Sequence, residues 1–220
     1  MSEAVRILRL ATGGDGVSRL ADGRTVFVPR TAPGDLVELT SPRLLARFAR
    51  ARVARLVEPG PGRVTPRCHH YIADDCGGCQ LQHLDLATQL DAKRAFVEDA
   101  LRRIGHLEVT VPPLMPADSE WGYRTRITLA IGPGRRFAGF HPQEEPARVF
   151  ALDRCEIATE PLNSLWGALK NQLHLLPDDV EQLVLRVDRE GQLHVVIKAG
   201  GDQAWGKGKR LAEALAEKGS

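Results

Sequence analysis

Three of the chain's four cysteines lie within twelve residues, and this spacing constrains the fold more than any other feature. They are Cys68, Cys76 and Cys79, and the fourth, Cys155, follows much later in the chain. The N-terminus has neither the apolar run nor the cleavage site of a signal peptide, so we expect a cytoplasmic protein. In that reducing compartment neither internal disulfides nor a disulfide-linked partner is expected. Thiols grouped in this way indicate metal ligation.

Two kinds of metal centre fit these thiols. Zinc prefers ligands in pairs that are close in sequence, and His69, His70 or His83 can complete a site of three cysteines and one histidine. An iron–sulfur cluster takes four thiolates, and Gly77-Gly78 leaves room for a bulky cubane and exposes backbone N–H groups to its sulfides. The spacing favours the cluster, with zinc as the alternative.

The first part of the chain is expected to form a small β-barrel. Turn signals separate short β-prone runs at residues 5–10, 16–20, 25–28, 36–40 and 51–57. Asp22-Gly23 predicts a hairpin. So many short strands in so few residues favour a closed barrel of the oligonucleotide-binding type, because closure removes free edges. The run Pro59-Gly60-Pro61-Gly62 ends the pattern, which predicts one domain at 1–59 and a second at 63–220.

The balance of basic and acidic residues changes near the same boundary. Residues 1–67 contain 12 arginines and 6 acidic residues, whereas the whole chain has 30 basic and 28 acidic residues. Five arginines lie between positions 43 and 55, among them Arg50 and Arg52. A local basic patch of this kind suits the phosphates of RNA. The alternative is a solvated face that protects an edge strand.

The second part is expected to be an α+β domain. Apolar residues recur at helical spacing between Asp85, a predicted N-cap, and Gly105, namely Leu86, Leu90, Val97, Leu101 and Ile104. We interpret this stripe as core. Alternation predicts a strand at 125–131 with hairpin partners at 137–141 and 148–152, a helix at 161–176, a hairpin around Glu190-Gly191 and a helix from about 209 to 217. Cys155 comes just after the predicted sheet of the strands at 125–131, 137–141 and 148–152.

Aromatic and basic residues are interleaved just before the first of these strands. They are Trp121, Tyr123, Arg124 and Arg126. Aromatic faces stack on unpaired bases and guanidinium groups pair with phosphates, so these four are candidate RNA contacts. The alternative places Trp121 in the core and leaves the arginines solvated.

The string CGGCQLQH at 76–83, together with WGYRTR at 121–126, resembles the RNA (uracil-C5)-methyltransferases that carry a 4Fe-4S cluster and modify uridines in 23S ribosomal RNA. The resemblance implies that Cys68, Cys76, Cys79 and Cys155 hold the cluster. It also implies that the barrel is a TRAM domain and that ribosomal RNA is the partner. The first cysteine spacing is two residues longer than in close relatives, which lengthens a loop without removing a ligand.

Members of this family also carry a C-terminal Rossmann-like domain, which binds S-adenosylmethionine and supplies the nucleophilic cysteine. All four cysteines here are already assigned to the cluster. The glycine loop at 201–208 fails as a phosphate site because Gly208 replaces the required Ser or Thr. We therefore expect the methyltransferase domain to be absent, and with it any catalytic residue.

The resulting expectation is the RNA-recognition and iron–sulfur part of a 23S rRNA methyltransferase, truncated before its catalytic domain. S-adenosylmethionine would then belong only to the full-length architecture, and a separately encoded methyltransferase domain is a candidate partner. The alternative is a stand-alone iron–sulfur or zinc RNA-binding protein without catalysis. No stretch is apolar enough to predict a membrane span.

Overall fold

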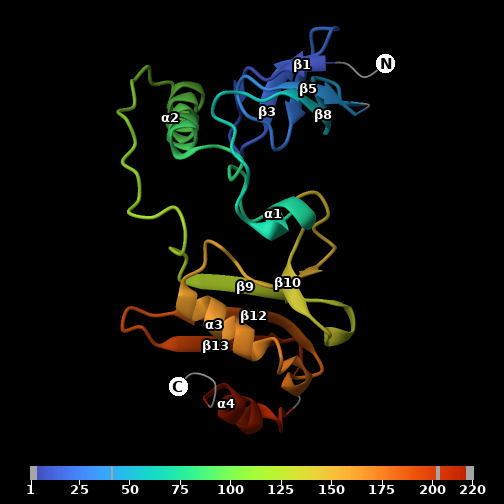
Figure 1. The fold of residues 1–220 in the computed structure, drawn as a ribbon, viewed down its shortest axis with the longest axis vertical. Coiled ribbons are helices and arrows are strands. Elements are labelled where there is room, and N and C mark those ends of the chain that lie inside the picture. Colours follow the sequence, from blue (N-terminus) through green and yellow to red (C-terminus); the bar gives the residue numbers. More distant parts are fainter. Residues whose placement is uncertain (1–3, 41, 202–203, 217–220) are drawn as a thin grey trace. The chain divides into compact units, whose positions relative to one another are not determined.

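The computed structural model describes residues 4–40, 42–201 and 204–216, and these residues form two compact units (Figure 1). The first unit comprises the chain up to Pro66 together with Cys79–Ala117. The second comprises Arg67–Gly78 and the chain from Asp118 onward. Neither unit is continuous in sequence, because the segment 67–78 belongs with the later strands. Within the described ranges, no helix combines the length and the apolar character needed to cross a bilayer.

The strands of the first unit form two sheets around one core. One sheet has the order β1-β5-β8 and the other the order β2-β3-β4-β7-β6. The pair β4–β7 is parallel, and the other neighbours are antiparallel. The strands are β1 (Ala4–Arg6), β2 (Arg9–Leu10), β3 (Gly16–Arg19), β4 (Thr25–Val28), β5 (Leu36–Leu39), β6 (Arg43–Leu44), β7 (Phe48–Arg50) and β8 (Val53–Glu58).

Both sheets contribute to one apolar core. Val26 and Val28 from β4, Val37 from β5 and Ala49 from β7 are completely buried in it. The hairpin predicted at Asp22-Gly23 is confirmed: it joins β3 to β4, and Gly23 has a φ of 85°. A left-handed backbone at this position favours glycine over residues with a Cβ.

The helix predicted after Asp85 is present, but its packed face differs from the prediction. This helix, α2 (Leu86–Arg103), begins where the Oδ1 atom of Asp85 accepts a hydrogen bond from the N–H of Thr88 at 2.7 Å. Ala92 and Phe96 pack against a small buried cluster of Leu10, Ala32 and Leu84. The stripe interpreted as core is not buried, and Ile104 just beyond the helix is 81% exposed. The interpretation is wrong because helical spacing shows that a helix has an apolar side without showing which side meets a neighbour.

A buried ion pair closes the first unit. The carboxylate of Asp35 is completely buried and pairs with Arg63 at 2.6 Å. It also accepts hydrogen bonds from the N–H groups of Gly60 and Ala32, both at 2.7 Å. Burial alone would raise the pKa of Asp35, but Arg63 and the two N–H donors outweigh burial and lower this pKa below its ordinary value of 3.8. The carboxylate therefore ties the turn before β5 to the chain that follows β8.

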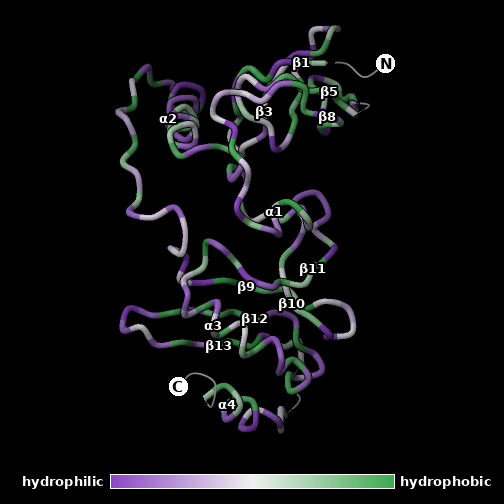
Figure 2. The backbone as a smooth tube through the Cα atoms, in the orientation of Figure 1, coloured by the Kyte–Doolittle hydropathy of each residue, from purple (hydrophilic) through white to green (hydrophobic). Residues whose placement is uncertain are grey.

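The second unit is a single sheet covered by helices on one side. The strand order is β11-β10-β9-β12-β13, and every neighbouring pair is antiparallel. Figure 2 shows hydrophobic residues recurring among hydrophilic ones along these strands. The elements are α1 (His69–Ala73), β9 (Arg126–Ile131), β10 (Ala138–Phe140), β11 (Phe150–Ala151), α3 (Glu160–Leu169), β12 (Val180–Val187), β13 (Leu193–Ala199) and α4 (Gly208–Ala216).

Most elements predicted for the second part are confirmed, and one helix is shorter. The helix expected over 161–176 ends at Leu169 and is followed by a short 3₁₀ turn at Leu173–Leu175. Trp166 of α3 is buried against the sheet, and its indole N–H donates to the carbonyl oxygen of Leu152 at 3.0 Å. The last helix is present, although Glu217, included in its predicted range, lies outside the described residues.

The buried Asp35 pair generates a prediction about stability. We expect Asp35→Asn to lower the free energy of unfolding by about 3 kcal/mol, because it removes a buried charge from a partner that stays partly buried. A group whose pKa is lowered by folding stabilises the protein above its unfolded pKa, and this contribution is lost as pH falls through the folded value. The difference between wild type and variant should therefore shrink below about pH 4.

Urea unfolding between pH 7 and pH 2 measures this difference. Glu58→Gln, which breaks the exposed Arg6–Glu58 pair of the same unit, is the matched control and should cost less than about 1 kcal/mol. Equal costs for the two variants would contradict a structural role for the buried pair.

Candidate functional site

The loop at 67–78 places two cysteines in the second unit. Cys68 is the N-cap of α1 and is buried. After the helix, the N–H of Cys76 donates to the carbonyl oxygen of His70 at 3.0 Å, and Cys76 forms an isolated β-bridge with Pro142. These backbone links hold the loop against the segment that follows β10.

His70 connects this loop to the segment that leads to Cys155. Its Nδ1 atom lies 2.7 Å from the Oδ2 atom of Asp74, and its Nε2 atom accepts a hydrogen bond from the N–H of Asp153 at 2.9 Å. A backbone amide can only donate, so the ring proton resides on Nδ1. The ring also packs on Phe150, with centroids 5.2 Å apart. Because both nitrogens are engaged, His70 is not the fourth ligand of the zinc alternative.

The turn that carries Cys155 is held by one buried amide side chain. The Oδ1 atom of Asn163 accepts a hydrogen bond from the N–H of Cys155 at 3.0 Å. Its Nδ2 atom donates to the carbonyl oxygens of Cys155 at 3.1 Å and Ala158 at 3.2 Å. Asn163 is only 8% exposed and lies on α3. The helix therefore fixes the position of the cysteine through three hydrogen bonds.

Several neighbours act on the thiol of Cys155. Burial is the largest influence and raises the pKa of this thiol, and the nearby Cys68 raises it further. The N–H groups of Ala158 and Ile157 and the charge of Arg124 oppose this effect, because they favour the thiolate. Cys68 and Cys155 are therefore close enough to interact, although 87 positions separate them in the sequence.

Cys68, Cys76, Cys79 and Cys155 are the candidate donors for a metal centre, and four thiols are suitable ligands for an iron–sulfur cluster. Cys79, however, belongs to the first unit, whereas the other three cysteines belong to the second. Among the residues that the structure describes, no group of three or more His, Cys, Asp or Glu side chains is arranged to hold a metal ion. The donor chemistry fits a cluster, the described geometry contains no assembled site, and the metal assignment stays a prediction.

Trp121 and Tyr123 occupy different environments. Trp121 is partly buried, and the guanidinium of Arg67 lies over its ring, 5.2 Å from the centroid. Arg67 also pairs with Glu156 at 3.1 Å. Tyr123 is 55% exposed and follows Gly122, whose φ is 62°. Of the two aromatic rings, Tyr123 is the more accessible to a base.

The two arginines that follow Tyr123 are both exposed. The N–H of Arg124 donates to the carbonyl oxygen of Ile157 at 2.7 Å, which fixes its backbone next to the Cys155 turn. Arg126 is the first residue of β9. The structure therefore brings Arg124 close to the cysteine segment and places Arg126 on the sheet.

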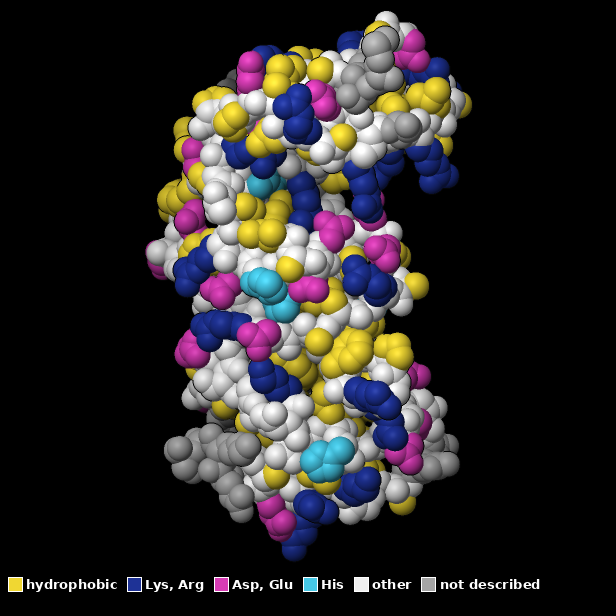
Figure 3. Space-filling view, turned by 45° about the vertical axis from the view of Figure 1, so that its right-hand side comes forward, with side chains coloured by type: hydrophobic (Ala, Val, Ile, Leu, Met, Phe, Trp, Pro, Cys, Tyr) yellow, Lys and Arg dark blue, Asp and Glu magenta, His cyan; other side chains and the backbone are white. Residues whose placement is uncertain are grey.

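The remaining candidates, Arg50 and Arg52, belong to the first unit. Arg50 ends β7 and pairs with Asp15 at 3.3 Å. The N–H of Arg52 donates to the Oγ1 atom of Thr40 at 3.1 Å, and its side chain is exposed. Basic and acidic side chains are intermixed on the face shown in Figure 3.

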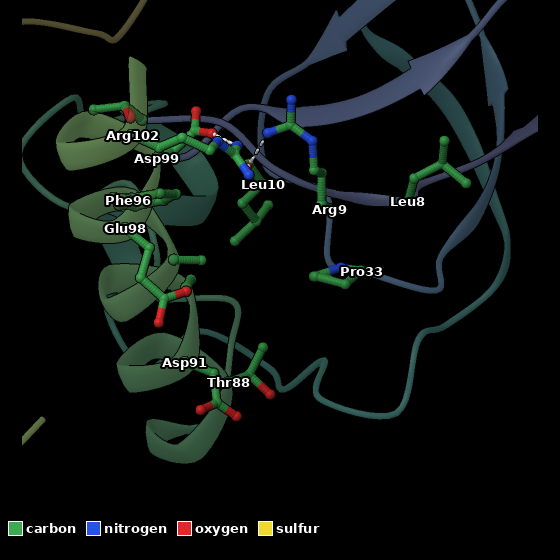
Figure 4. Close-up of a pocket in the computed structure, with 13 residues that line it drawn as sticks. Leu8, Arg9, Leu10, Pro33, Thr88, Asp91, Phe96, Glu98, Asp99 and Arg102 are labelled. Carbon is green, nitrogen blue, oxygen red and sulfur yellow. Dashed lines mark hydrogen bonds and ion pairs between the residues drawn. The ribbon is translucent and has the colours of Figure 1, made fainter. Parts of the chain in front are cut away.

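A groove in the first unit lies between α2 and the chain around β2 (Figure 4). It has a volume of about 540 Å³, and Leu10 and Phe96 are among its apolar lining residues. Asp91, Glu98 and Asp99 line it from the helix. Arg9 and Arg102 also line the groove, but its three carboxylates leave no excess of positive charge for a polyanion, so we do not include it among the candidate RNA contacts.

Three residues that organise the site escape prediction from sequence. They are His70, which the sequence offers only as a zinc ligand, and Asn163 and Arg67, for which the sequence predicts no role. For Asn163 a signal exists, because it is the polar residue on the buried face of an otherwise apolar helix. A buried polar side chain needs hydrogen-bond partners. Nothing in the sequence indicates what those partners are.

Comparison with known proteins shows the relatives of this chain, although no family model matches it. An uncharacterized RNA methyltransferase of Thermosynechococcus vestitus is 39% identical over 181 residues, which is 81% of this chain and 39% of that protein. By sequence, this chain is related to RNA methyltransferases. The 23S rRNA (uracil(1939)-C(5))-methyltransferase RlmD of Nitrosospira multiformis is 31% identical over 92% of this chain and 50% of its own length. The chain thus spans about 40 to 50% of the length of these relatives.

A solved methyltransferase structure is similar to this chain in its fold. The tRNA (uracil-54, C5)-methyltransferase of Pyrococcus abyssi, solved in complex with S-adenosyl-L-homocysteine, matches 94% of this chain and 48% of its own chain, with a TM-score of 0.63 and 23% identity. Nearly the whole chain thus has the fold of part of a methyltransferase. The expected fold class is therefore wrong, because its claim that the methyltransferase domain is absent conflicts with this match.

The expected function is corrected in the same way. Neither an RNA-recognition part that lacks catalysis nor a stand-alone RNA-binding protein is supported, because the sequence relatives and the structural match are methyltransferases. The expectation rests on a missing thiol and a missing glycine loop. Such an argument fails for a chain that spans only part of the length of its relatives.

Asn163 provides a test of how the Cys155 turn is held. We expect Asn163→Ala to lower the free energy of unfolding by about 2 to 3 kcal/mol, because it leaves the buried N–H and carbonyl groups of the turn without partners. Cys155 should also react faster with a thiol reagent, measured by following the modified cysteine by mass spectrometry. Asn171→Ala, which removes a single exposed hydrogen bond to Gly167, is the control and should change neither quantity appreciably. An unchanged rate of Cys155 modification in Asn163→Ala would contradict the role of Asn163 in holding the Cys155 turn.

Proposed function

We propose that this chain is part of an S-adenosylmethionine-dependent methyltransferase that modifies C5 of uracil in RNA, with ribosomal RNA as its substrate. The observation that carries this proposal is the agreement between two unlike relatives. The sequence relative RlmD and the structural neighbour from Pyrococcus abyssi are named for different RNAs, yet both are named for uracil C5. The shared property is the chemistry at the base, so we assign this chemistry to the protein.

The proposed reaction replaces the hydrogen on C5 of uracil with a methyl group. S-adenosylmethionine supplies the methyl carbon, whose bond to sulfur breaks as its bond to C5 forms, and S-adenosylhomocysteine and the C5 proton leave. We assign no catalytic residue among the described residues. The residues to which we do assign a role are proposed RNA contacts.

The residues proposed to contact RNA lie in both units. Tyr123 offers an exposed ring for stacking, and Arg124 and Arg126 offer charges for phosphates. Trp121 is proposed to act together with Arg67, which lies over its ring and orders the segment before β9. In the barrel, which we propose to be a TRAM-like RNA-binding domain, the exposed side chains of Arg50 and Arg52 are the proposed phosphate contacts.

We also propose that Cys68, Cys76, Cys79 and Cys155 bind a 4Fe-4S cluster. The support is the donor set and the electrostatic interaction between Cys68 and Cys155. Such a cluster would connect the loop at 67–78 to the turn after β11, in addition to the hydrogen bonds of His70. Its proposed role is structural.

The activity is tested by methyl transfer. The full-length protein, incubated with a 23S rRNA transcript and S-adenosylmethionine labelled in its methyl group, should yield 5-methyluridine after nuclease digestion, measured by chromatography and mass spectrometry. A transcript with its uridines replaced by 5-fluorouridine, which has no hydrogen at C5, serves as the matched control and should yield no 5-methyluridine. Label found on another base or at another position would contradict the proposed chemistry.

The metal is tested separately from the activity. Protein purified without oxygen should contain iron and sulfide and show a broad visible absorption band, and Cys155→Ser should lose both. His69→Ala, which removes an exposed imidazole beside Cys68, is the control and should keep them. Zinc in place of iron would contradict the cluster, and zinc lost in His69→Ala would support the three-cysteine, one-histidine alternative.

A further inference from the structure

The sheet of the second unit has one face buried and one face open. Apolar residues at odd positions, Ile127 and Leu129 in β9 and Leu183 and Leu185 in β12, belong to the core that includes α3 and α4. Figure 1 shows α3 lying against these strands. Successive side chains of a strand point to opposite faces, so the even-numbered residues of β9, β12 and β13 share the other face.

The strand register arranges this second face in three rows. The antiparallel pairing aligns Arg126 with Arg186 and His194, Thr128 with Val184 and Val196, and Ala130 with Gln182 and Lys198. Val184 is only 4% exposed and fills the centre, while Val196 beside it is 46% exposed. Arg126, Arg186 and Lys198 are all exposed. None of the nine positions is acidic, which makes this face basic.

The placement of Arg126 opposite Arg186 is by itself unfavourable for the stability of the sheet. Arg126 and Arg186 are directly opposed across β9 and β12, and like charges in this position destabilise a sheet. In the described part of the chain neither guanidinium makes an ion pair. The carboxylate nearest in sequence, Asp188, is engaged by His194 at 2.6 Å and by the N–H groups of Glu190 and Gln192. The charges of this row are therefore not neutralised from within the sheet.

We propose that this open face, defined by Arg126, Arg186 and Lys198, binds the phosphate backbone of the RNA. The inference rests on the proposed function and adds Arg186 and Lys198 to its RNA contacts. A bound phosphate places negative charge beside the two opposed arginines and offsets their repulsion. The nine positions contain no Phe, Tyr or Trp, so the face holds the backbone and does not stack bases. Tyr123, just before β9, remains the candidate for stacking.

The experiment measures RNA binding by fluorescence anisotropy across a range of salt concentrations. The probe is a fluorescein-labelled hairpin transcript, and the full-length protein is used with Arg186→Ala, Lys198→Ala and the double variant. Each single variant should weaken binding roughly five-fold and reduce the slope of log K against log salt by about 0.7 to 1. Arg186→Lys, which keeps the charge, should keep most of the slope. Lys209→Ala, on α4 behind the opposite face, is the matched control and should bind like the wild type.

Thermal unfolding of the same variants separates binding from folding. Because Arg186→Ala removes a like-charge pair, its melting temperature should equal or exceed that of the wild type while its RNA affinity falls. A protein that methylates RNA but binds it equally well in Arg186→Ala and Lys198→Ala overturns this inference and leaves the proposed function intact. Weakened binding in these variants with no methyl transfer by the wild type supports the inference and overturns the function. Equal losses in Lys209→Ala, or no RNA binding by the wild type, overturn the inference.

Discussion

The second unit depends on a small number of buried polar side chains that join segments far apart in the sequence. Asn163 satisfies the backbone of the Cys155 turn, and His70 joins the loop after Cys68 to Asp153. Neither the turn nor the loop is part of a sheet ladder or a long helix, so their polar groups have few alternative partners. Buried amides and carbonyls without partners are costly. These two side chains therefore help to fix the segments that carry Cys68, Cys76 and Cys155 within the second unit.

A buried polar side chain has a similar role in the first unit, where Asp35 neutralises Arg63 and accepts hydrogen bonds from two backbone N–H groups. Both units thus use buried polar side chains to hold an irregular segment in place: Asp35 in the first unit, and Asn163 and His70 in the second. The open face of the second sheet has the opposite character. There, charges stand opposed without compensation from the described residues, which is the arrangement expected where an outside anion is bound. In the proposed action on RNA, the rigid segments position the site and the uncompensated arginines attract phosphates.

Local features of the sequence predicted local structure well. Asp22-Gly23 predicted its hairpin and Asp85 its helix start, because both depend on interactions within a few residues. The core prediction for the stripe on α2 is wrong, because Ala92 and Phe96 instead pack in a cluster that includes Leu10 and Ala32, at least sixty positions earlier. The absence of a methyltransferase domain was inferred wrongly from missing residues. Relatives twice as long show that such an absence cannot be derived from a partial span.

The sequence by itself determined the turns, the alternation of the strands, the helix starts and the relationship to RNA methyltransferases. All of these are encoded in residue types over short windows or in similarity along the chain. Only the tertiary structure decided that Cys155 lies near Cys68, that His70 uses both ring nitrogens, and that Arg186 stands opposite Arg126. These facts depend on which strands pair and in which register. The register between β9 and β12, which are far apart in the sequence, depends on which face of each strand is buried, so neither strand's sequence contains it alone.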